Sequence, residues 1–125
     1  MFRVIQTDKA PAAIGPYSQA VIYGNLMFAS GQIPIDPASG QLVEGDIRVQ
    51  AQQVMKNIEG LLQAAGIGFA NVIKTTCFLK NMDDFAAFNE VYEKYFTGKP
   101  ARSCVAAAKL PRDVLCEVEV IAVIE

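Results

Sequence analysis

Apolar residues along this chain of 125 residues recur with two different periods, one typical of helices and one typical of strands. Between 47 and 65 they recur every three or four positions. This spacing predicts an amphipathic helix with Asp46 as its N-cap and Gly66 just beyond its C-terminus. A second helix is predicted over about 82–96. Its N-terminal cap is Asn81 or Asp83, its end is marked by Gly98 and Pro100, and its apolar stripe comprises Phe85, Phe88, Tyr92 and Tyr95.

Short β-branched and apolar runs predict the strands, at 2–6, 17–23, 26–33, 71–80, 102–109 and 114–124. Gly24 and Asn25 predict a tight hairpin between the second and third strands. The segments 8–16 and 34–45 are rich in Pro and Gly, which indicates loops. This order of elements predicts an α+β fold in which two helices pack on one face of a mixed sheet. With no repeat or linker in the sequence, we expect a single domain over 1–125.

The last predicted strand is apolar on both faces. Alternation places Val114, Cys116, Val118, Val120 and Ala122 on one face, and Leu115, Glu117, Glu119, Ile121 and Val123 on the other. A strand with two apolar faces is normally covered on both. Since the two helices cover one face of so small a sheet, we expect another copy of the chain to cover the other.

Composition excludes several chemistries. The chain has no His, which rules out a Ser-His-Asp triad, a Cys-His pair and His-ligated zinc or haem. Its net charge of −2 provides no general attraction to nucleic acid or an anionic membrane. No stretch approaches the 18 apolar residues of a membrane span, and residues 1–10 lack the apolar run of a signal peptide. The three cysteines form no CxxC motif, so we expect reduced core thiols in a cytoplasmic protein and no metal site.

Candidate chemistry concentrates near the C-terminus. Glu117 and Glu119 share a face about 7 Å apart, and Arg102 and Cys104 share a face of the preceding strand. If those two strands pair, a guanidinium and carboxylates meet on a mostly apolar surface. One interpretation is a structural ion pair or a pair of carboxylates at a wet rim. The other is a site in which Arg102 binds a substrate carboxylate and a glutamate handles water or protons.

Other candidates have ordinary structural interpretations beside functional ones. Tyr17 starts a strand, where tyrosine is usually half-buried. Ser30 and Gly31 lie near a strand end, where glycine allows close approach of a ligand but also ends strands. Asn89 lies on the second helix, where asparagine is usually solvated. No phosphate-binding loop or stripe of alternating basic and aromatic residues is present.

Three motifs follow one another along the chain. The N-terminal motif is Ala10-Pro11-Ala12-Ala13-Ile14-Gly15-Pro16-Tyr17-Ser18-Gln19-Ala20, and the central one is Ser30-Gly31-Gln32-Ile33-Pro34. The C-terminal signature is Pro100-Ala101-Arg102-Ser103-Cys104-Val105, followed by Leu110-Pro111 and Glu117-Val118-Glu119. Together these motifs resemble the Rid (YjgF) family, in particular its RidA-type 2-iminobutanoate/2-iminopropanoate deaminases, and the resemblance covers essentially the whole chain.

The resemblance implies a chorismate-mutase-like fold and a homotrimer, with sheets toward the centre and three sites between subunits. It implies hydrolysis of a 2-imino acid to a 2-keto acid and ammonia without a cofactor or metal. Arg102 corresponds to the family's carboxylate-binding arginine and Glu117, rather than Glu119, to its catalytic glutamate. Further site-lining positions are Tyr17, Ser30, Gly31, Asn89 and Cys104, the last acting largely through its backbone. Neither nucleic acid nor a membrane is an expected partner.

The sequence departs from the family pattern at Ala106-Ala107-Ala108, often more polar, and at the shorter Thr97-Gly98-Lys99. Both lie close to Arg102, so they bear on cleft shape and on the size of the substrate. Three alternatives remain open at this stage. Cys104 could act as a nucleophile, although no His base accompanies it. The chain could be a non-catalytic module that binds small carboxylates, or it could have the RNA-acting or protein-holding role attributed to parts of the family.

Overall fold

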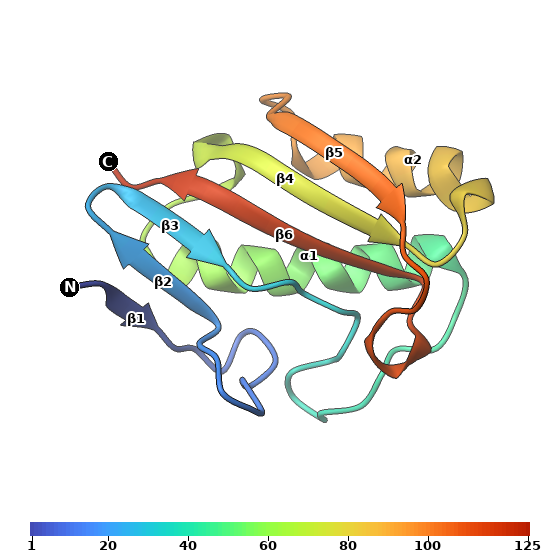
Figure 1. Cartoon of the computed structure of the whole chain (residues 1–125), viewed down its shortest axis with the longest axis horizontal. Helices are drawn as coiled ribbons and strands as arrows, with labels where there is room; N and C mark the ends of the chain where they lie inside the picture. Colours follow the sequence, from blue (N-terminus) through green and yellow to red (C-terminus); the bar gives the residue numbers. More distant parts are fainter.

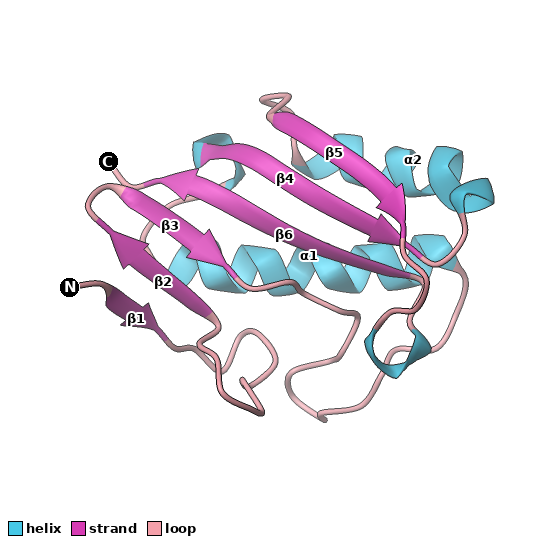
Figure 2. Cartoon of the chain, in the orientation of Figure 1, coloured by secondary structure: helices cyan, strands magenta, loops and turns pink.

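A computed structural model describes residues 1–125 and shows a six-stranded mixed sheet with two helices (Figure 1, Figure 2). The strands are β1 (Arg3–Ile5), β2 (Ala20–Tyr23), β3 (Leu26–Ala29), β4 (Val72–Leu79), β5 (Ala101–Ala106) and β6 (Cys116–Val123). Their order across the sheet is β1-β2-β3-β6-β4-β5. Only the pair β4 and β5 is parallel. The predicted α+β class and mixed sheet are confirmed.

Both helices pack on the same face of the sheet (Figure 1). Helix α1 (Ile47–Ala64) follows β3 and leads into β4, and α2 (Phe85–Tyr95) connects β4 to its parallel neighbour β5. Both connections progress in the same direction across the sheet. Because crossovers between parallel strands are right-handed, two successive crossovers in one direction place their helices on one face. The prediction of two helices on one face is therefore confirmed.

The core lies between the sheet and these helices. The apolar stripe of α1 is buried, with Val54, Met55 and Ile58 fully inaccessible. From the sheet it meets the inward residues of β6, which are Cys116, Val118, Val120 and Ala122. Asp46 caps α1 by accepting a hydrogen bond from the Val49 amide, and Gly66 follows the helix with a φ of 75°, as predicted.

The opposite face of the sheet, which we call the open face, carries no helix (Figure 2). It exposes apolar side chains, including 41% of Phe28, 65% of Tyr23 and 49% of Val105. Ile121 and Val123 of β6 are half-buried on this face, and Lys74, Glu117 and Glu119 are the charged residues among them. The predicted second apolar face of the last strand is thus present, and nothing within the chain covers it.

Several predicted strand boundaries are wrong. The strand predicted over 17–23 begins only at Ala20, because Pro16 lacks an amide and the Tyr17 amide closes a turn onto the Gly15 carbonyl. The strand predicted over 26–33 ends at Ala29, and Gln32 then pairs with Val118 of β6 in an isolated bridge.

The remaining boundaries differ less. The strands predicted over 2–6 and 71–80 each lose a residue at both ends, and the last two, predicted over 102–109 and 114–124, occupy 101–106 and 116–123. The second helix begins with a 3-10 turn (Met82–Asp84), whose cap is the Asn81 side chain. Neither helix combines the length and apolar character needed to cross a membrane.

Candidate active site

Glu117 lies on β6 and faces the open side of the sheet, directly over Gly31. Its backbone pairs with that of Phe78 on β4. A Cβ atom on Gly31 would lie only 2.9 Å from the carboxyl carbon of Glu117. Hydrogen bonds between Gln32 and Val118, of 2.8 and 3.2 Å, hold the two segments at this separation. Any side chain at position 31 would therefore displace the Glu117 carboxyl group from its place over the backbone.

The environment of Glu117 raises its pKa above the ordinary value of 4.5. Partial burial is the main cause, because it disfavours the charged form, and repulsion from Glu119 on the same face adds to it. Glu117 has no ion-pair partner within the chain, whose two salt bridges are Arg48–Glu90 and Lys80–Asp113. A carboxyl group with this environment is suited to exchange a proton with a bound water.

Ser30 and Tyr17 lie beside Gly31. The Ser30 hydroxyl donates to the Ser18 carbonyl at 2.7 Å, which fixes the side chain and leaves its oxygen lone pairs available. Tyr17 is 54% exposed, and with Gly31, Ile14 and Arg112 it lines a cavity of about 330 Å³. The structure thus brings Tyr17, Ser30, Gly31 and Glu117 into one region, as the motifs suggested.

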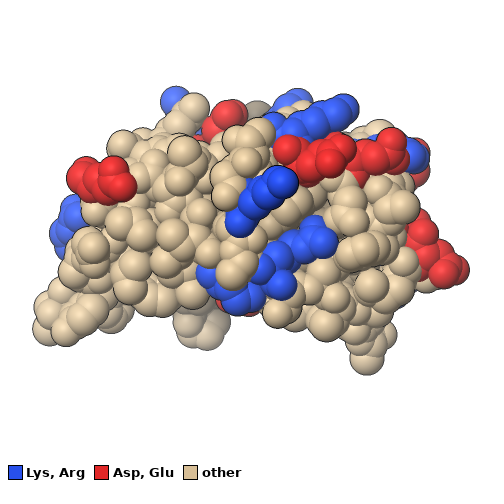
Figure 3. Space-filling view, turned by 90° about the horizontal axis from the view of Figure 1, so that it is seen from above, with Lys and Arg blue, Asp and Glu red and all other residues tan.

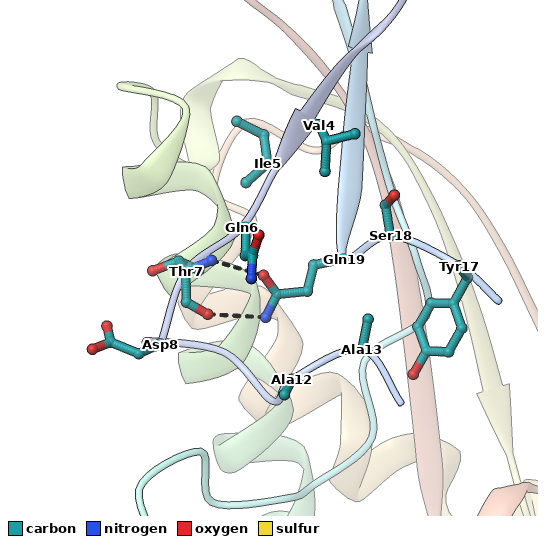
Figure 4. A pocket seen from close by; sticks show the side chains of 10 residues that line it. All are labelled: Val4, Ile5, Gln6, Thr7, Asp8, Ala12, Ala13, Tyr17, Ser18 and Gln19. Atoms are coloured by element: carbon teal, nitrogen blue, oxygen red, sulfur yellow. Dashed lines mark hydrogen bonds between the residues drawn. The ribbon is translucent and has the colours of Figure 1, made fainter. Parts of the chain in front are cut away.

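A cavity of about 520 Å³ lies next to this region, lined by residues from 4–8 and 12–19 (Figure 4). Gln19 points across it toward Thr7, accepting from the Thr7 amide and donating to the Thr7 carbonyl, while Tyr17 lies at the far rim. The side-chain amide nitrogen of Gln19 also donates to the carbonyls of Ala10 and Pro11. Gln19 therefore holds the N-terminal loop in place, and with it the position of Tyr17.

Arg102 lies on β5 at the edge of the sheet and faces the helices. Its Nη1 atom donates to Oδ1 of Asn89 at 2.7 Å. Its guanidinium carbon lies 4.7 Å from the ring centroid of Tyr92 and 5.3 Å from that of Phe85. No acidic side chain forms a salt bridge with it. Because its partners are all neutral, the charge of this half-buried guanidinium remains available to bind an external anion.

Cys104 follows two residues later on the same face of β5 and pairs in register with Cys77 of β4. All three cysteines carry free thiols. Burial raises the pKa of Cys104, and this effect outweighs the opposing influence of Arg102. The thiol is thus kept protonated, which is the reverse of what a nucleophilic cysteine requires. No three His, Cys, Asp or Glu side chains lie close enough together to hold a metal ion.

The predicted candidates therefore form two groups on opposite faces of the sheet. The expectation that Arg102 and Glu117 meet on two paired strands is wrong within one chain, because β4 separates β5 from β6. Arg102 is held on the helix face by Asn89 and Tyr92, whereas Glu117 points to the open face. A continuous sheet prevents one small molecule from contacting both groups within a single chain.

Sequence reasoning missed the aromatic neighbours of Arg102. Phe85 and Tyr92 were interpreted as members of a core stripe, and Tyr92 is indeed buried. The available signal is the spacing of Phe85, Asn89 and Tyr92, which are separated by four and three positions and so lie on one face of a helix. Only the packing of α2 against β5 shows that this face meets an arginine.

Comparisons with known proteins find similarity over nearly the whole chain. The sequence profile described as endoribonuclease L-PSP matches residues 7–124. A RutC family protein from Pyrococcus horikoshii is 54% identical over 98% of both chains. A protein of Escherichia coli named 2-iminobutanoate/2-iminopropanoate deaminase is 47% identical, again over 98% of both chains.

The fold is also similar to that of solved structures. The crystal structure of Escherichia coli TdcF with bound serine matches with a TM-score of 0.93 and 42% sequence identity. The match covers 98% of the present chain and 99% of that protein. Sequence and fold are thus similar over nearly the full length of these relatives.

Proposed function

Because the chain belongs to the endoribonuclease L-PSP family, also called the Rid or YjgF family, we propose that it hydrolyses 2-imino acids to 2-keto acids and ammonia. The proposed substrates are 2-iminobutanoate and 2-iminopropanoate. The observation that carries the proposal is an uncompensated guanidinium, Arg102, matched by a half-buried carboxyl group of raised pKa, Glu117. A protonated imine that carries a carboxylate requires these two groups, one to bind the carboxylate and one to activate water.

In the proposed reaction Arg102 binds the substrate carboxylate and so orients the imine carbon. Glu117 takes a proton from a water molecule as the water oxygen attacks the imine carbon, and the C=N π electrons move onto nitrogen. Glu117 then returns the proton to the nitrogen. The C–N bond breaks and its electron pair leaves with ammonia. The remaining hydroxyl then gives its proton to the Glu117 carboxylate, which releases it to solvent, as the keto group forms. A protonated imine is itself a strong electrophile, so the proposal requires neither a metal nor a cofactor.

Other residues have supporting roles in the proposal. The Gly31 amide and the Cys104 backbone bind the ends of the substrate, with Tyr17 and the Ser30 oxygen lining the cleft. Asn89 acts through Arg102, because its Oδ1 atom accepts a hydrogen bond of 2.7 Å from Nη1 of the arginine. The Cys104 thiol itself has no part in the reaction. The reduced state of all three thiols fits a cytoplasmic protein.

The proposal includes a homotrimer with a site in each cleft between subunits. Its support is the apolar open face, together with the separation of Arg102 and Glu117 on opposite faces of one sheet. A neighbouring copy packed on the open face would remove exposed side chains such as Phe28 and Tyr23 from water. It would also bring its own Arg102 toward Glu117, completing a site that one chain lacks.

Mixing two inactive variants tests whether the site is shared. We expect Arg102→Ala and Glu117→Gln to be inactive as separate trimers. Co-expressed, doubly tagged trimers all contain both variants, and about one of the three sites in each combines an intact Arg102 from one copy with an intact Glu117 from the next. Keto-acid formation should therefore return to about a third of the unmutated rate. Mixed trimers that stay inactive would contradict a site divided between copies.

The proposed reaction is tested in an assay in which a second enzyme, a dehydratase, supplies the imine. Threonine dehydratase converts threonine to an enamine and imine that hydrolyse slowly to 2-ketobutyrate. Adding the folded protein should accelerate 2-ketobutyrate release, since general acid–base assistance contributes about 10²–10⁴-fold. Repeating the assay with dehydratases for other amino acids gives the preferred side-chain length. An unchanged rate of keto-acid release with a demonstrably folded trimer would overturn the proposal.

The main alternative is a module that binds a small carboxylate at Arg102 without catalysis. The presence of Glu117 favours catalysis. The Glu117→Gln variant distinguishes an enzyme from a binding module, because only an enzyme loses turnover. An RNA-directed role has less support, because the chain has a net charge of −2 and no His. On the face shown in Figure 3, basic side chains adjoin a band of acidic ones instead of forming a uniformly basic stripe.

A further inference from the structure

One face of α2 forms a neutral cradle around the guanidinium of Arg102. We define this cradle as Phe85, Asn89 and Tyr92. The two ring centroids lie 5.3 and 4.7 Å from the guanidinium carbon, and the asparagine oxygen accepts from Nη1 at 2.7 Å. The electron-rich faces of aromatic rings attract a cation without neutralising it.

Tyr92 is itself held in place by a hydrogen bond to the neighbouring strand β4. Its hydroxyl shares a hydrogen bond of 2.8 Å with Oγ1 of Thr75, and both residues are buried. Thr75 lies on β4 and pairs in register with Arg102 on β5. The tyrosine ring is thus anchored to the strand beside the one that carries the arginine, and this closed set of contacts restricts the ring to one orientation.

The cradle contains no carboxylate, although one stands nearby. Glu93 lines the same cavity of about 300 Å³ as Asn89, Tyr92 and Arg102, but it forms no salt bridge with the arginine. A carboxylate in the cradle would compete with an incoming anion for the guanidinium. Neutral partners instead hold the group in place and leave its charge available.

We propose that Tyr92, supported by Thr75 and Phe85, is a positioning residue that fixes the plane of the Arg102 guanidinium for a ligand carboxylate. The inference rests on the proposed function, because it assigns the imino acid's carboxylate to Arg102. Fixing a flexible arginine before binding removes part of the entropic cost that binding otherwise carries. Tyr92 does not itself contact the substrate in this account.

The test compares Tyr92→Leu with Tyr95→Leu, which removes another tyrosine ring from the same helix. Tyr95 packs against Phe69, with ring centroids 5.4 Å apart, and is not one of the two rings over the Arg102 guanidinium. We expect Tyr92→Leu to raise KM for the imine, and Kd for 2-oxobutanoate, about tenfold, with kcat within about threefold. Tyr95→Leu should leave both values near those of the unmutated protein.

Conservative variants separate positioning from stability. Tyr92→Phe keeps the ring but loses the bond to Thr75, so KM should rise only about two- to threefold. Phe85→Leu should raise KM by a similar amount, and it decides the matter if Tyr92→Leu does not fold. Equal KM values in the unmutated protein, Tyr92→Leu and Phe85→Leu would overturn the inference. So would equal increases in Tyr92→Leu and Tyr95→Leu.

A readout independent of activity separates this inference from the proposed function. The Nε–H signal of Arg102 in the nitrogen-15 spectrum of the unliganded protein should exchange slowly with water. It should broaden or vanish in Tyr92→Leu and persist in Tyr95→Leu. Loss of the signal in both variants, or in neither, would contradict the positioning role. Absence of imine hydrolysis with this pattern intact would instead remove the proposed function and leave the cradle as a site for another carboxylate.

Discussion

Replacing Arg102 with alanine should lower kcat/KM for imine hydrolysis about 10²–10³-fold while the trimer still assembles. The guanidinium is the only group of the proposed site that offers two parallel donors to a carboxylate. Without it the substrate loses both a charge-assisted contact and its orientation toward the water. Arg102→Lys should recover only part of the activity, because an ammonium group is a point charge without the planar fork. The measurement is initial-rate kinetics in the dehydratase-coupled assay.

Arg48→Ala is the matched control for this prediction. Arg48 lies on α1 and pairs with Glu90 of α2 on the surface, with both side chains more than half exposed. Exposed ion pairs contribute about 0–1 kcal/mol to stability, so this variant should behave as the unmutated protein does. Arg102→Ala also loses packing against Phe85 and Tyr92, so its assembly must be verified by gel filtration. An assembled Arg102→Ala trimer with unchanged kcat/KM would exclude Arg102 from the site.

Glu117→Gln should lower kcat about 10²–10⁴-fold and change KM little. Glutamine has nearly the shape of glutamate and should stay over Gly31, but it cannot accept a proton from water. Binding of 2-oxobutanoate, measured by calorimetry, should persist in this variant. Unchanged turnover in Glu117→Gln would favour the alternative of a non-catalytic binding module.

The pH dependence follows from the direction of the Glu117 pKa shift. A general base acts only when ionised, and burial raises its pKa, so ionisation requires a higher pH than for an ordinary glutamate. The catalysed rate should therefore fall on acidification, with a midpoint above 4.5, after subtraction of the uncatalysed rate. Glu117→Gln should lack this acid limb.

Glu119→Gln provides the control on the same face of β6. Glu119 is exposed and contributes to the raised pKa of Glu117 through repulsion. Its neutralisation should keep the protein active and move the acid limb to lower pH. A limb that stays in place, or one that moves to higher pH, would assign the titration to another group.

The parts of the fold that follow from local pattern were predictable. The helix from Ile47 has an uninterrupted apolar stripe, a capping Asp46 and a terminal Gly66, all short-range signals. The two apolar faces of the last strand likewise appeared in the sequence, because alternation depends on nothing beyond the strand. The boundary at Gln32 was not predictable, since it depends on a bridge to Val118 on the distant strand β6. The boundary at Tyr17 was missed because a local turn onto the Gly15 carbonyl takes the place of the strand.

The motifs also indicated the candidate residues, but not their arrangement. Tyr17, Ser30, Gly31 and Glu117 do gather, because the segment after β3 runs beside β6. Arg102 does not join them, since β4 is inserted between two strands that follow each other in the chain. Strand order is a long-range property, and a local pattern of apolar and polar residues carries little information about it.

By itself, the sequence determined the class of the fold, the absence of histidine chemistry, the uncovered apolar face and the set of residues able to carry a reaction. The physical reason is that periodicity, composition and residue chemistry are local and survive any choice of strand order. Only the tertiary structure decided that Arg102 and Glu117 lie on opposite faces, that Gly31 makes room for a carboxyl group, and that α2 cradles the guanidinium. These features depend on which strands neighbour each other and on which face the crossover helices pack, and packing of the whole chain decides both.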